Sequence, residues 1–356
     1  MSALGEAIAR LIRQEGPISV ERYMALALSH PQHGYYMSRE PFGTEGVFIT
    51  APEISQMFGE LVGLWAAQVW EILGAPAPVR LVELGPGRGT LMQDALRAAR
   101  VAQHFLASLD VHLVETSPRL EAAQRERLAG GVPATWHRSI GTLPDGPAIV
   151  IANELFDALP LRQYVRAPDG WRERCVGLGE DGALMFGLAP APEPGIAVEA
   201  AEGAVLEVAV AGQQLMRALS ARIAAQGGAL LLLDYGHIQT GIGDTLQALR
   251  GHRFADVLAG PGESDLTAHV DFAALARAAR REGLAVQGPV AQGAFLRRLG
   301  IEERAQALAR NASDGQRADI AAALARLTQG GANMGELFKA MAICPAGTPP
   351  LPGFSA

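Results

Sequence analysis

Short apolar runs alternate with segments of helical periodicity in the middle of this chain. Five of these runs predict buried strands: VRLVELG, DVHLVE, ATWHRSI, AIVIANE and ALLLLDYG. The intervening segments predict helices over Thr90–Arg100, Pro118–Leu128 and 213–226. Strands that alternate with helices pair in parallel, with helices on both faces of the sheet. The order therefore predicts an α/β fold with a doubly wound, mostly parallel sheet.

The first 75 residues predict helices and a lid ahead of this sheet. One helix is expected on each side of Gly16-Pro17. The turn-rich stretch that follows, HPQHGYYMSREPFGTEGVFITAP, has no period, and a long segment of that kind is often a functional lid. Apolar residues then recur at helical spacing from Pro52 to about Leu73. Residues 1–75 are therefore predicted to form N-terminal helices and an active-site lid.

The rest of the chain is predicted to form a core domain and a C-terminal region. The core is expected over residues 76–292, with an insertion at about 162–212. Within the insertion, apolar and polar residues alternate around Asp-Gly turns, which predicts a β-hairpin. Residues 293–356 are predicted to hold helices over 295–329, followed by a Pro-rich tail.

Charge and cysteine content limit the function classes. Of 356 residues, 49% are hydrophobic and 19% charged, and the net charge is −7. A nucleic-acid-binding protein would more often be basic, so we expect no nucleic-acid partner. Cys175 and Cys344 lack metal-ligand spacing, so we expect no metal site and a reducing compartment. No apolar run reaches membrane-spanning length and the first helix lacks a signal-peptide core, so we expect a bacterial-type cytoplasmic protein without stable membrane insertion.

A glycine-rich turn with an acidic residue follows the first strand. LVELGPGRGTL places Glu83, Gly85, Gly87 and Gly89 between a strand and a helix. Glycines there let a ligand approach backbone N–H groups at the start of the helix. Glu115 ends the next strand, where a carboxylate can accept hydrogen bonds from ribose hydroxyls. The pattern indicates a nucleotide-type cofactor. A structural turn and a nicotinamide or flavin cofactor remain alternatives, although the dinucleotide pattern needs a third glycine where this chain has threonine.

Several motifs together resemble one family. The pattern E-x-G-x-G-x-G with a strand-end acid resembles the cofactor site of class I S-adenosylmethionine-dependent methyltransferases. The wider chain, from about residue 4 to 343, resembles the MidA-type methyltransferases through HPQHGYYM, FITAPEISQMFGELVGLW, VELGPGRGTL, ANELFDALP, DYGH, DLTAHVDF and MGELFKAMA. That family includes bacterial proteins of unassigned substrate and mitochondrial complex I assembly factors that dimethylate an arginine. The resemblance implies a Rossmann-like fold with a seven-stranded sheet, S-adenosyl-L-methionine as cofactor and methyl transfer to a protein arginine.

The resemblance also implies a set of cofactor-binding residues. The three glycines would cradle the methionine end of the cofactor, and Glu83 would orient the turn and the amino group. Glu115 would hold the ribose, and residues from His137 to Ile140 would lie near the adenine. A structural role at the strand end is the alternative for His137. The expected set is Glu83, Gly85, Pro86, Gly87, Gly89, Thr90, Glu115, Thr116, His137, Ser139 and Asn153.

The motif ANELFD places polar residues directly after the fourth strand. Ligands bind at the carboxyl ends of parallel strands, so this motif should lie beside the reacting methyl group. A guanidinium acceptor is cationic, and carboxylates can bind and orient it. We therefore expect Glu154 as the main guanidinium ligand, Asn153 as a positioning amide, and Asp157 as a second acid or loop anchor. The structural alternative is that Glu154 and Asp157 cap the following turn.

Lid and strand-end residues complete the expected site. The lid should fold over the cofactor, although Thr50 and Pro52 also fit the start of a helix. A structural role is the alternative for Asp234. The expected substrate and lid set is Tyr35, Thr50, Pro52, Glu53, Ser55, Gln56, Asp234 and Tyr235. The family usually has Gly-Asp-Phe where this chain has Gly46-Val47-Phe48, with Glu45 as the candidate replacement for the missing carboxylate.

Three functions remain open on these residues. The first is a protein arginine N-methyltransferase that acts on a protein partner. The second keeps the cofactor but methylates a small molecule or another protein side chain. The third is an assembly or adaptor protein that binds the cofactor with weak or no activity, which Val47 keeps open. The oligomeric state also stays open.

Overall fold

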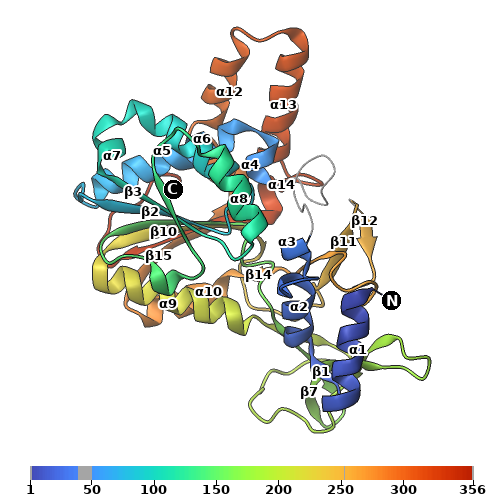
Figure 1. Cartoon of the computed structure of the whole chain (residues 1–356). Helices are drawn as coiled ribbons and strands as arrows, with labels where there is room; N and C mark the ends of the chain where they lie inside the picture. Colours follow the sequence, from blue (N-terminus) through green and yellow to red (C-terminus); the bar gives the residue numbers. More distant parts are fainter. Residues whose placement is uncertain (1, 39–49, 252, 355–356) are drawn as a thin grey trace. The chain divides into compact units, whose positions relative to one another are not determined.

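The computed structural model describes residues 2–38, 50–251 and 253–354. The chain divides into two compact units (Figure 1), each built from segments far apart in the sequence. The smaller unit comprises Met1–Phe48, Phe156–Leu215 and Gln239–Asp271; the larger comprises Ile49–Leu155, Met216–Ile238 and Phe272–Ala356. The predicted domains, with boundaries at 75/76 and 292/293, are consecutive parts of the chain, whereas these units are made of interleaved segments. The two divisions differ in kind, so the predicted boundaries stay a prediction.

The larger unit is built on a mostly parallel sheet. Its strands lie in the order β15-β16-β10-β5-β2-β3-β4. All neighbours from β10 to β4 pair in parallel, and only β16 runs antiparallel to the strands on both sides of it. This arrangement confirms the predicted α/β sheet. The strands are β2 (Val79–Leu84), β3 (Leu109–Val114), β4 (Ala134–His137), β5 (Ala148–Asn153), β10 (Gly228–His237), β15 (Leu284–Ala291) and β16 (Phe338–Pro345).

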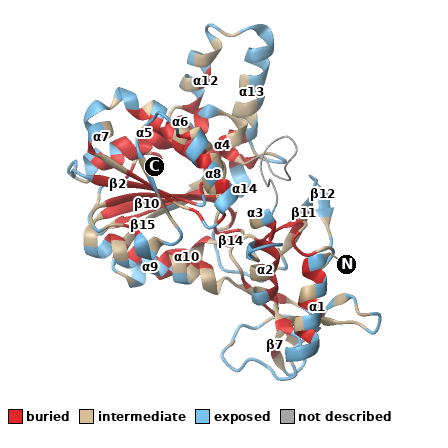
Figure 2. Ribbon diagram, viewed as in Figure 1, coloured by how far each residue is buried: buried red, intermediate tan, exposed pale blue. Residues whose placement is uncertain are grey.

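Helices cover both faces of this sheet and bury its central strands (Figure 2). Figure 1 shows α5 (Gln56–Ile72), α6 (Thr90–Ala98) and α7 (Gln103–Ser108) on one face and α9 (Val210–Gln226) and α10 (Phe272–Arg281) on the other. Ile149 and Ile151 of β5 share a buried cluster with Trp65 of α5. At Gly63, α5 lies so close to α6 that a Cβ would be 2.5 Å from the Ala95 backbone. Helices α6 and α8 (Pro118–Arg127) match two of the predicted helices, with the 3₁₀ turn η1 (Ala99–Val101) after α6.

The predicted helix from Pro52 to Leu73 is divided in two. A short helix, α4 (Ala51–Ile54), ends at Ser55, whose backbone is extended. The Ser55 hydroxyl accepts a hydrogen bond from the Met57 N–H at 3.2 Å and so begins α5. Helical spacing of apolar residues continues across this break, which is why the sequence did not reveal it.

The C-terminal region contains a strand where the sequence analysis predicted a tail. Its helices are α11 (Gln292–Arg298), α12 (Ile301–Ala309), α13 (Asp314–Thr328) and α14 (Met334–Leu337). The expected Pro-rich tail is wrong for residues 338–345, because they form β16 inside the sheet. Ala340 to Cys344 are almost completely buried. A strand covered on both faces carries no alternating pattern, so a short apolar run near the end of the chain gave little signal.

The smaller unit combines helices with two antiparallel sheets. The predicted hairpin of the insertion is present as β6 (Arg162–Ala167) and β7 (Gly170–Leu178). It is part of a five-stranded sheet that also includes β1 (Ile18–Ser19), β8 (Leu184–Leu188) and β9 (Val205–Val208). A three-stranded sheet consists of β11 (Gln247–Arg250), β12 (Arg253–Ala255) and β13 (Asp265–Thr267), and the remaining elements are α1 (Ala3–Glu15), α2 (Val20–Ser29), α3 (Tyr35–Ser38) and β14 (Val270–Asp271).

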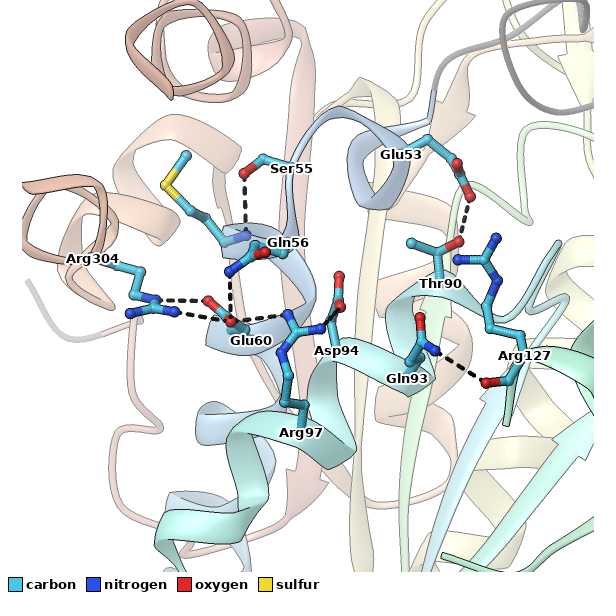
Figure 3. Close-up of polar contacts among 11 residues, drawn as sticks. Glu53, Ser55, Gln56, Glu60, Thr90, Gln93, Asp94, Arg97, Arg127 and Arg304 are labelled. Atoms are coloured by element: carbon cyan, nitrogen blue, oxygen red, sulfur yellow. Dashed lines mark hydrogen bonds and ion pairs between the residues drawn. The ribbon is translucent and has the colours of Figure 1, made fainter. Parts of the chain in front are cut away.

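Buried charges link three helices of the larger unit (Figure 3). Glu60 of α5 accepts hydrogen bonds from Arg97 of α6 at 2.9 Å and from Arg304 of α12 at 2.7 Å. Arg97 also pairs with Asp94 at 2.7 Å. Burial alone would raise the pKa of Glu60, but its hydrogen bonds with the two arginines lower it below the usual value. Glu60 is therefore the anion on which two helices converge.

Replacing Glu60 by glutamine should destabilise the larger unit. The substitution leaves Arg97 and Arg304 without their shared anion, and both arginines are partly exposed, so we expect a loss of about 1–3 kcal/mol in the free energy of unfolding at pH 7. Because the folded pKa of Glu60 is lowered, its contribution is present above the unfolded value and disappears as the pH falls through the folded value. Urea unfolding should thus show a wild-type-to-variant difference that shrinks in acid. Glu303→Gln, an exposed control on α12, should cause little change at either pH.

Candidate functional site

The glycine-rich turn joins β2 to α6. Gly85, Gly87 and Gly89 have φ values of 61°, 53° and 79°, which lie in the left-handed region that favours glycine. A Cβ on Gly85 would lie 2.9 Å from Leu155 Cδ1. The Pro86 carbonyl accepts the Gly89 N–H at 2.7 Å and closes the turn. The turn therefore needs its glycines for backbone conformation and for close approach.

Glu83 lies buried at the end of β2 with one oxygen unpaired. Its side chain is 3% exposed, and Oε2 has no hydrogen-bond partner among the described residues. Burial raises the pKa of Glu83 to about 8, against the opposing effect of a backbone hydrogen bond from Met92. A carboxyl group held in this way is suited to a cationic ligand group, which would restore its ionised form.

Glu115 follows β3 with both oxygens hydrogen-bonded. Oε1 accepts the Ser117 N–H at 2.7 Å, and Oε2 accepts Gln124 Nε2 at 3.1 Å. Burial raises the pKa of Glu115, and these two bonds oppose the rise. The neighbouring Thr116 carbonyl accepts Arg138 Nη1 at 2.6 Å. The carboxylate is therefore held in one orientation at the edge expected to bind ribose.

His137 and Ser139 lie at the end of β4. His137 Nε2 is 2.9 Å from His112 Nδ1, and His137 Nδ1 is 3.0 Å from Thr142 Oγ1. The same threonine hydroxyl donates to the Ser139 carbonyl at 3.0 Å. Burial and the neighbouring His112 lower the pKa of His137. Both ring nitrogens thus have protein partners, as the structural alternative for this residue requires.

Asn153 and Glu154 form the end of β5. Asn153 Nδ2 donates to Glu154 Oε1 at 3.1 Å, and the Ala51 N–H of α4 donates to the same oxygen at 2.8 Å. Asn153 Oδ1 is buried without a hydrogen-bond partner among the described residues. Glu154 has φ +49°, a conformation that costs a non-glycine residue about 1–3 kcal/mol and is concentrated at functional sites. The Glu154 carboxylate therefore binds the first N–H group of α4.

Asp234 and Tyr235 lie at the end of β10. The two Asp234 oxygens accept the Leu155 N–H at 3.2 Å and the Tyr235 N–H at 2.9 Å. The Tyr235 ring lies against Phe338, with ring centroids 5.3 Å apart. Through these contacts Asp234 supports the backbone beside Glu154. A structural role is the alternative interpretation of this residue, and the contacts agree with it.

Helix α4, in the described part of the predicted lid, lies against the glycine-rich turn. Glu53 accepts hydrogen bonds from the Arg88 guanidinium. It also accepts one from the Thr90 hydroxyl (Figure 3). Burial would raise the pKa of Glu53, but these bonds lower it. Pro52 is buried in α4, and Thr50 makes no side-chain cap although its carbonyl accepts the Glu53 N–H. Ser55 caps α5, and Gln56 donates to Glu60 at 3.2 Å.

The larger unit brings together one part of the expected set. Glu83, Glu115, Asn153 and Glu154 lie at carboxyl ends of neighbouring strands in the larger unit, with the glycine-rich turn and α4. Asp157 belongs to the smaller unit, where its carbonyl accepts the Ala268 N–H at 2.9 Å. Tyr35 belongs to the same unit and contacts Tyr36 edge-on. Val47 and Glu45 lie outside the described residues.

Sequence reasoning missed two side chains that support the site. Arg88 lies within the glycine-rich turn, but no sequence pattern predicted that it would pair with Glu53. Gln124 had a signal: it stands between Leu120 and Leu128 at spacing of four, on the buried side of α8. A polar residue on an apolar helix face usually has a buried partner.

Among residues 2–38, 50–251 and 253–354, no three His, Cys, Asp or Glu side chains gather as a metal site requires. None of the helices built from those residues is long and apolar enough to cross a membrane.

The residues present fit the cofactor that the sequence resemblance implies. S-adenosyl-L-methionine has donor groups at its methionine end and on its ribose. Glu83 Oε2 and Asn153 Oδ1 are buried acceptors that lack donors among the described residues. Buried polar atoms of this kind are costly unless a ligand satisfies them. The bare backbone of the glycine-rich turn adds N–H groups at the start of α6.

Known proteins similar to this chain are methyltransferases. A family model of S-adenosyl-L-methionine-dependent methyltransferases matches residues 61–290. The mitochondrial protein arginine methyltransferase NDUFAF7 of Danio rerio is 39% identical over 328 residues, covering 85% of this chain and 77% of that protein. The mitochondrial protein of the same name from Homo sapiens is 40% identical over 324 residues, covering 83% and 73%. These designations overturn the expectation of a cytoplasmic location, since the relatives are named mitochondrial.

A solved structure agrees in fold and ligand. A COG1565 superfamily protein from Burkholderia thailandensis, bound to S-adenosyl-homocysteine, matches with a TM-score of 0.85 and 29% identity, over 99% of this chain and 93% of that one. The family match spans more than half of this chain, and the cofactor is S-adenosyl-L-methionine. The chain therefore belongs to this MidA-type family of S-adenosyl-L-methionine-dependent methyltransferases.

Proposed function

We propose that the chain N-methylates an arginine side chain of a protein. The observation that carries the proposal is the Glu154 carboxylate, held in a left-handed backbone conformation at the end of β5. Relatives at 39% and 40% identity are named protein arginine methyltransferases. A carboxylate at this strand end favours a cationic acceptor over a neutral one. The adaptor and small-molecule alternatives are not favoured by the relatives.

The cofactor side of the site is assigned to the ends of β2, β3 and β4. S-adenosyl-L-methionine supplies an electrophilic methyl group on its sulfonium. The glycines of the turn cradle the methionine end, with Pro86 and Thr90 shaping the turn, and Glu83 binds the cationic amino group. Glu115 accepts hydrogen bonds from the ribose. Thr116, His137 and Ser139 line the adenine edge.

The acceptor side is assigned to the end of β5. Glu154 forms a charge-assisted hydrogen bond to the guanidinium and orients it for in-line attack. A carboxylate offers about four acceptor positions, so Glu154 can hold the Ala51 N–H and a guanidinium together. Asn153 positions the reacting groups through its amide.

The lid residues keep water from the reacting groups. Glu53 ties α4 to Arg88 and Thr90 of the glycine-rich turn, and Glu154 ties the start of the same helix to β5. The contacts of Glu53 and Glu154 together hold this four-residue helix at the strand ends. Excluding water strengthens the electrostatic contacts with the acceptor.

Gly87→Val should abolish cofactor binding without unfolding the chain. A β-branched residue is strongly disfavoured at φ +53°, and its side chain would block approach to the turn. Calorimetric titration with S-adenosylhomocysteine should show no binding, while circular dichroism stays native. Gly347→Ala is the matched control, because Gly347 has φ +84° and open space around it. Normal binding by a folded Gly87→Val protein would contradict the assignment.

Glu83→Gln should weaken cofactor binding and remove a pH dependence of stability. Because the folded pKa is raised to about 8, the folded protein holds more protons than the unfolded chain between the unfolded value and pH 8. The free energy of unfolding of the wild type should therefore fall as the pH rises from 5 to 8, and it should fall less in the variant. We also expect S-adenosylhomocysteine to bind the variant about 10- to 100-fold more weakly.

The control for Glu83 is an exposed carboxylate on α8. Glu126→Gln should bind S-adenosylhomocysteine like the wild type and share its pH dependence of unfolding. Equal pH dependence in wild type and Glu83→Gln, or unchanged binding, would refute the role given to Glu83.

Glu154→Gln tests the proposed function directly. The variant keeps an acceptor for the Ala51 N–H but loses the charge, so methyl transfer should fall about 10- to 100-fold with S-adenosylhomocysteine binding intact. The assay uses S-adenosylmethionine with a labelled methyl group and a lysate from cells that lack the gene. Amino-acid analysis of the labelled protein should yield N-methylarginine. Label on lysine, no label with wild type, or full activity of the variant would each rule the proposal out.

A further inference from the structure

Gln124 of α8 makes three hydrogen bonds from a fully buried position. Its Nε2 donates to the Gly87 carbonyl at 2.7 Å and to Glu115 Oε2 at 3.1 Å. Its Oε1 accepts Trp136 Nε1 at 2.9 Å, and the side chain is 0% exposed. One amide thus connects the glycine-rich turn after β2, the acid after β3 and the strand β4.

The orientation of this amide follows from Trp136. An indole N–H is only a donor, so the amide atom that faces it must be the oxygen. The NH₂ group is thereby directed at the Gly87 carbonyl and at Glu115, which are both acceptors. The Arg125 guanidinium lies 4.0 Å from the centre of the Trp136 ring and covers it. The hydrogen-bond pattern therefore has only one consistent assignment.

Few side chains could replace glutamine here. The site needs one acceptor toward Trp136 and two donors toward the turn and the carboxylate, which matches the inventory of a primary amide. A glutamate would place a second carboxylate against Glu115, and a methionine would supply no donor. Gly89 also packs on Gln124, because a Cβ at Gly89 would lie 3.4 Å from Gln124 Cγ.

Glu115 is oriented from two sides. The Ser117 N–H holds Oε1 at 2.7 Å, and Gln124 holds Oε2. Ser117 belongs to the same loop as Glu115, so the hydrogen bond between them does not fix the position of that loop relative to the rest of the unit. Gln124 comes from a helix and also donates to the Gly87 carbonyl, so its bond sets the Glu115 carboxylate relative to the glycine-rich turn.

We propose that Gln124 is a positioning residue for cofactor recognition: it aligns the Glu115 carboxylate with the glycine-rich turn, so that ribose and methionine end are bound in register. Gln124 acts through Glu115 and the Gly87 backbone. The inference rests on the proposed role of Glu115 as the ribose ligand, and the test below separates the two.

The test compares two ligands by calorimetry. The probes are S-adenosylhomocysteine and its 3′-deoxyribose analogue, which lacks one ribose hydroxyl. The ratio of their dissociation constants measures how well the ribose ligand is placed. The proteins are wild type, Glu115→Ala, Gln124→Met and the control Gln93→Met. Gln93 of α6 donates a side-chain hydrogen bond to the Arg127 carbonyl at 3.0 Å (Figure 3), so its variant loses a similar bond away from Glu115.

We expect the ratio to be large in wild type and in Gln93→Met. It should fall toward one in Glu115→Ala and in Gln124→Met, with S-adenosylhomocysteine bound about tenfold or more weakly by Gln124→Met. A merely structural role would weaken both ligands equally and leave the ratio unchanged. A ratio lost in Glu115→Ala but kept in Gln124→Met would overturn the inference alone. A ratio kept in both would overturn the role of Glu115 and the inference with it.

Gln124→Glu gives a second readout and keeps the acceptor for Trp136. Its carboxyl would face Glu115, whose own charge raises the pKa of Glu83 and whose pKa the Arg138 charge acts to lower. Two adjacent carboxylates share a proton, so the variant should regain a donor as the pH is lowered. We expect its affinity for S-adenosylhomocysteine, relative to wild type, to rise about tenfold from pH 8 to pH 6. A constant relative affinity would overturn the inference.

Discussion

Parallel pairing of β2, β3 and β5 is the constraint on which the site depends. Parallel strands end at one edge, so the residues that follow them must meet there. The pairing of Glu83 with Ile151 and with Leu113 brings the acid of β2 level with its neighbours. β5 is fully buried, β2 nearly so and β3 in its middle, so the turns present the residues at this edge. The proposed cofactor site, made of buried acids and glycine backbone, follows from this geometry.

The helix α4 shows how the edge is closed. Its first N–H is held by Glu154 from β5, and its own Glu53 is held by Arg88 and Thr90 from the turn after β2. The residue proposed to bind the acceptor therefore also positions the lid. Likewise, Thr90 of the cofactor turn also holds that lid. Acceptor, cofactor turn and lid are thus linked through one short helix, and a change in one should be felt by the others.

Local signals in the sequence predicted the sheet and the cofactor turn, but not the contacts between distant segments. Apolar runs marked β2, β3, β5 and β10, and glycine spacing marked the turn, because both depend on neighbouring residues. β16 was missed because it is inserted between β10 and β15 from the far end of the chain. The break at Ser55 was missed because apolar periodicity continues through it. The partner of Glu53 could not be foreseen, since 35 residues separate it from Arg88.

Part of the energetic cost of this fold lies where the ligands are expected, although buried side-chain atoms of Arg80, Ser220 and Gln292 also lack hydrogen-bond partners among the described residues. Glu83 Oε2 and Asn153 Oδ1 are buried acceptors without donors in the part of the chain that the structure describes, and Glu154 has a backbone conformation that most residues avoid. Asp234 lies nearby and is equally buried, yet both of its oxygens accept backbone N–H groups. A carboxylate that only supports the fold can satisfy its hydrogen bonds within the chain. Glu83 and Asn153 each keep a buried acceptor that no described residue satisfies, and this is the strongest physical reason to assign them to a ligand.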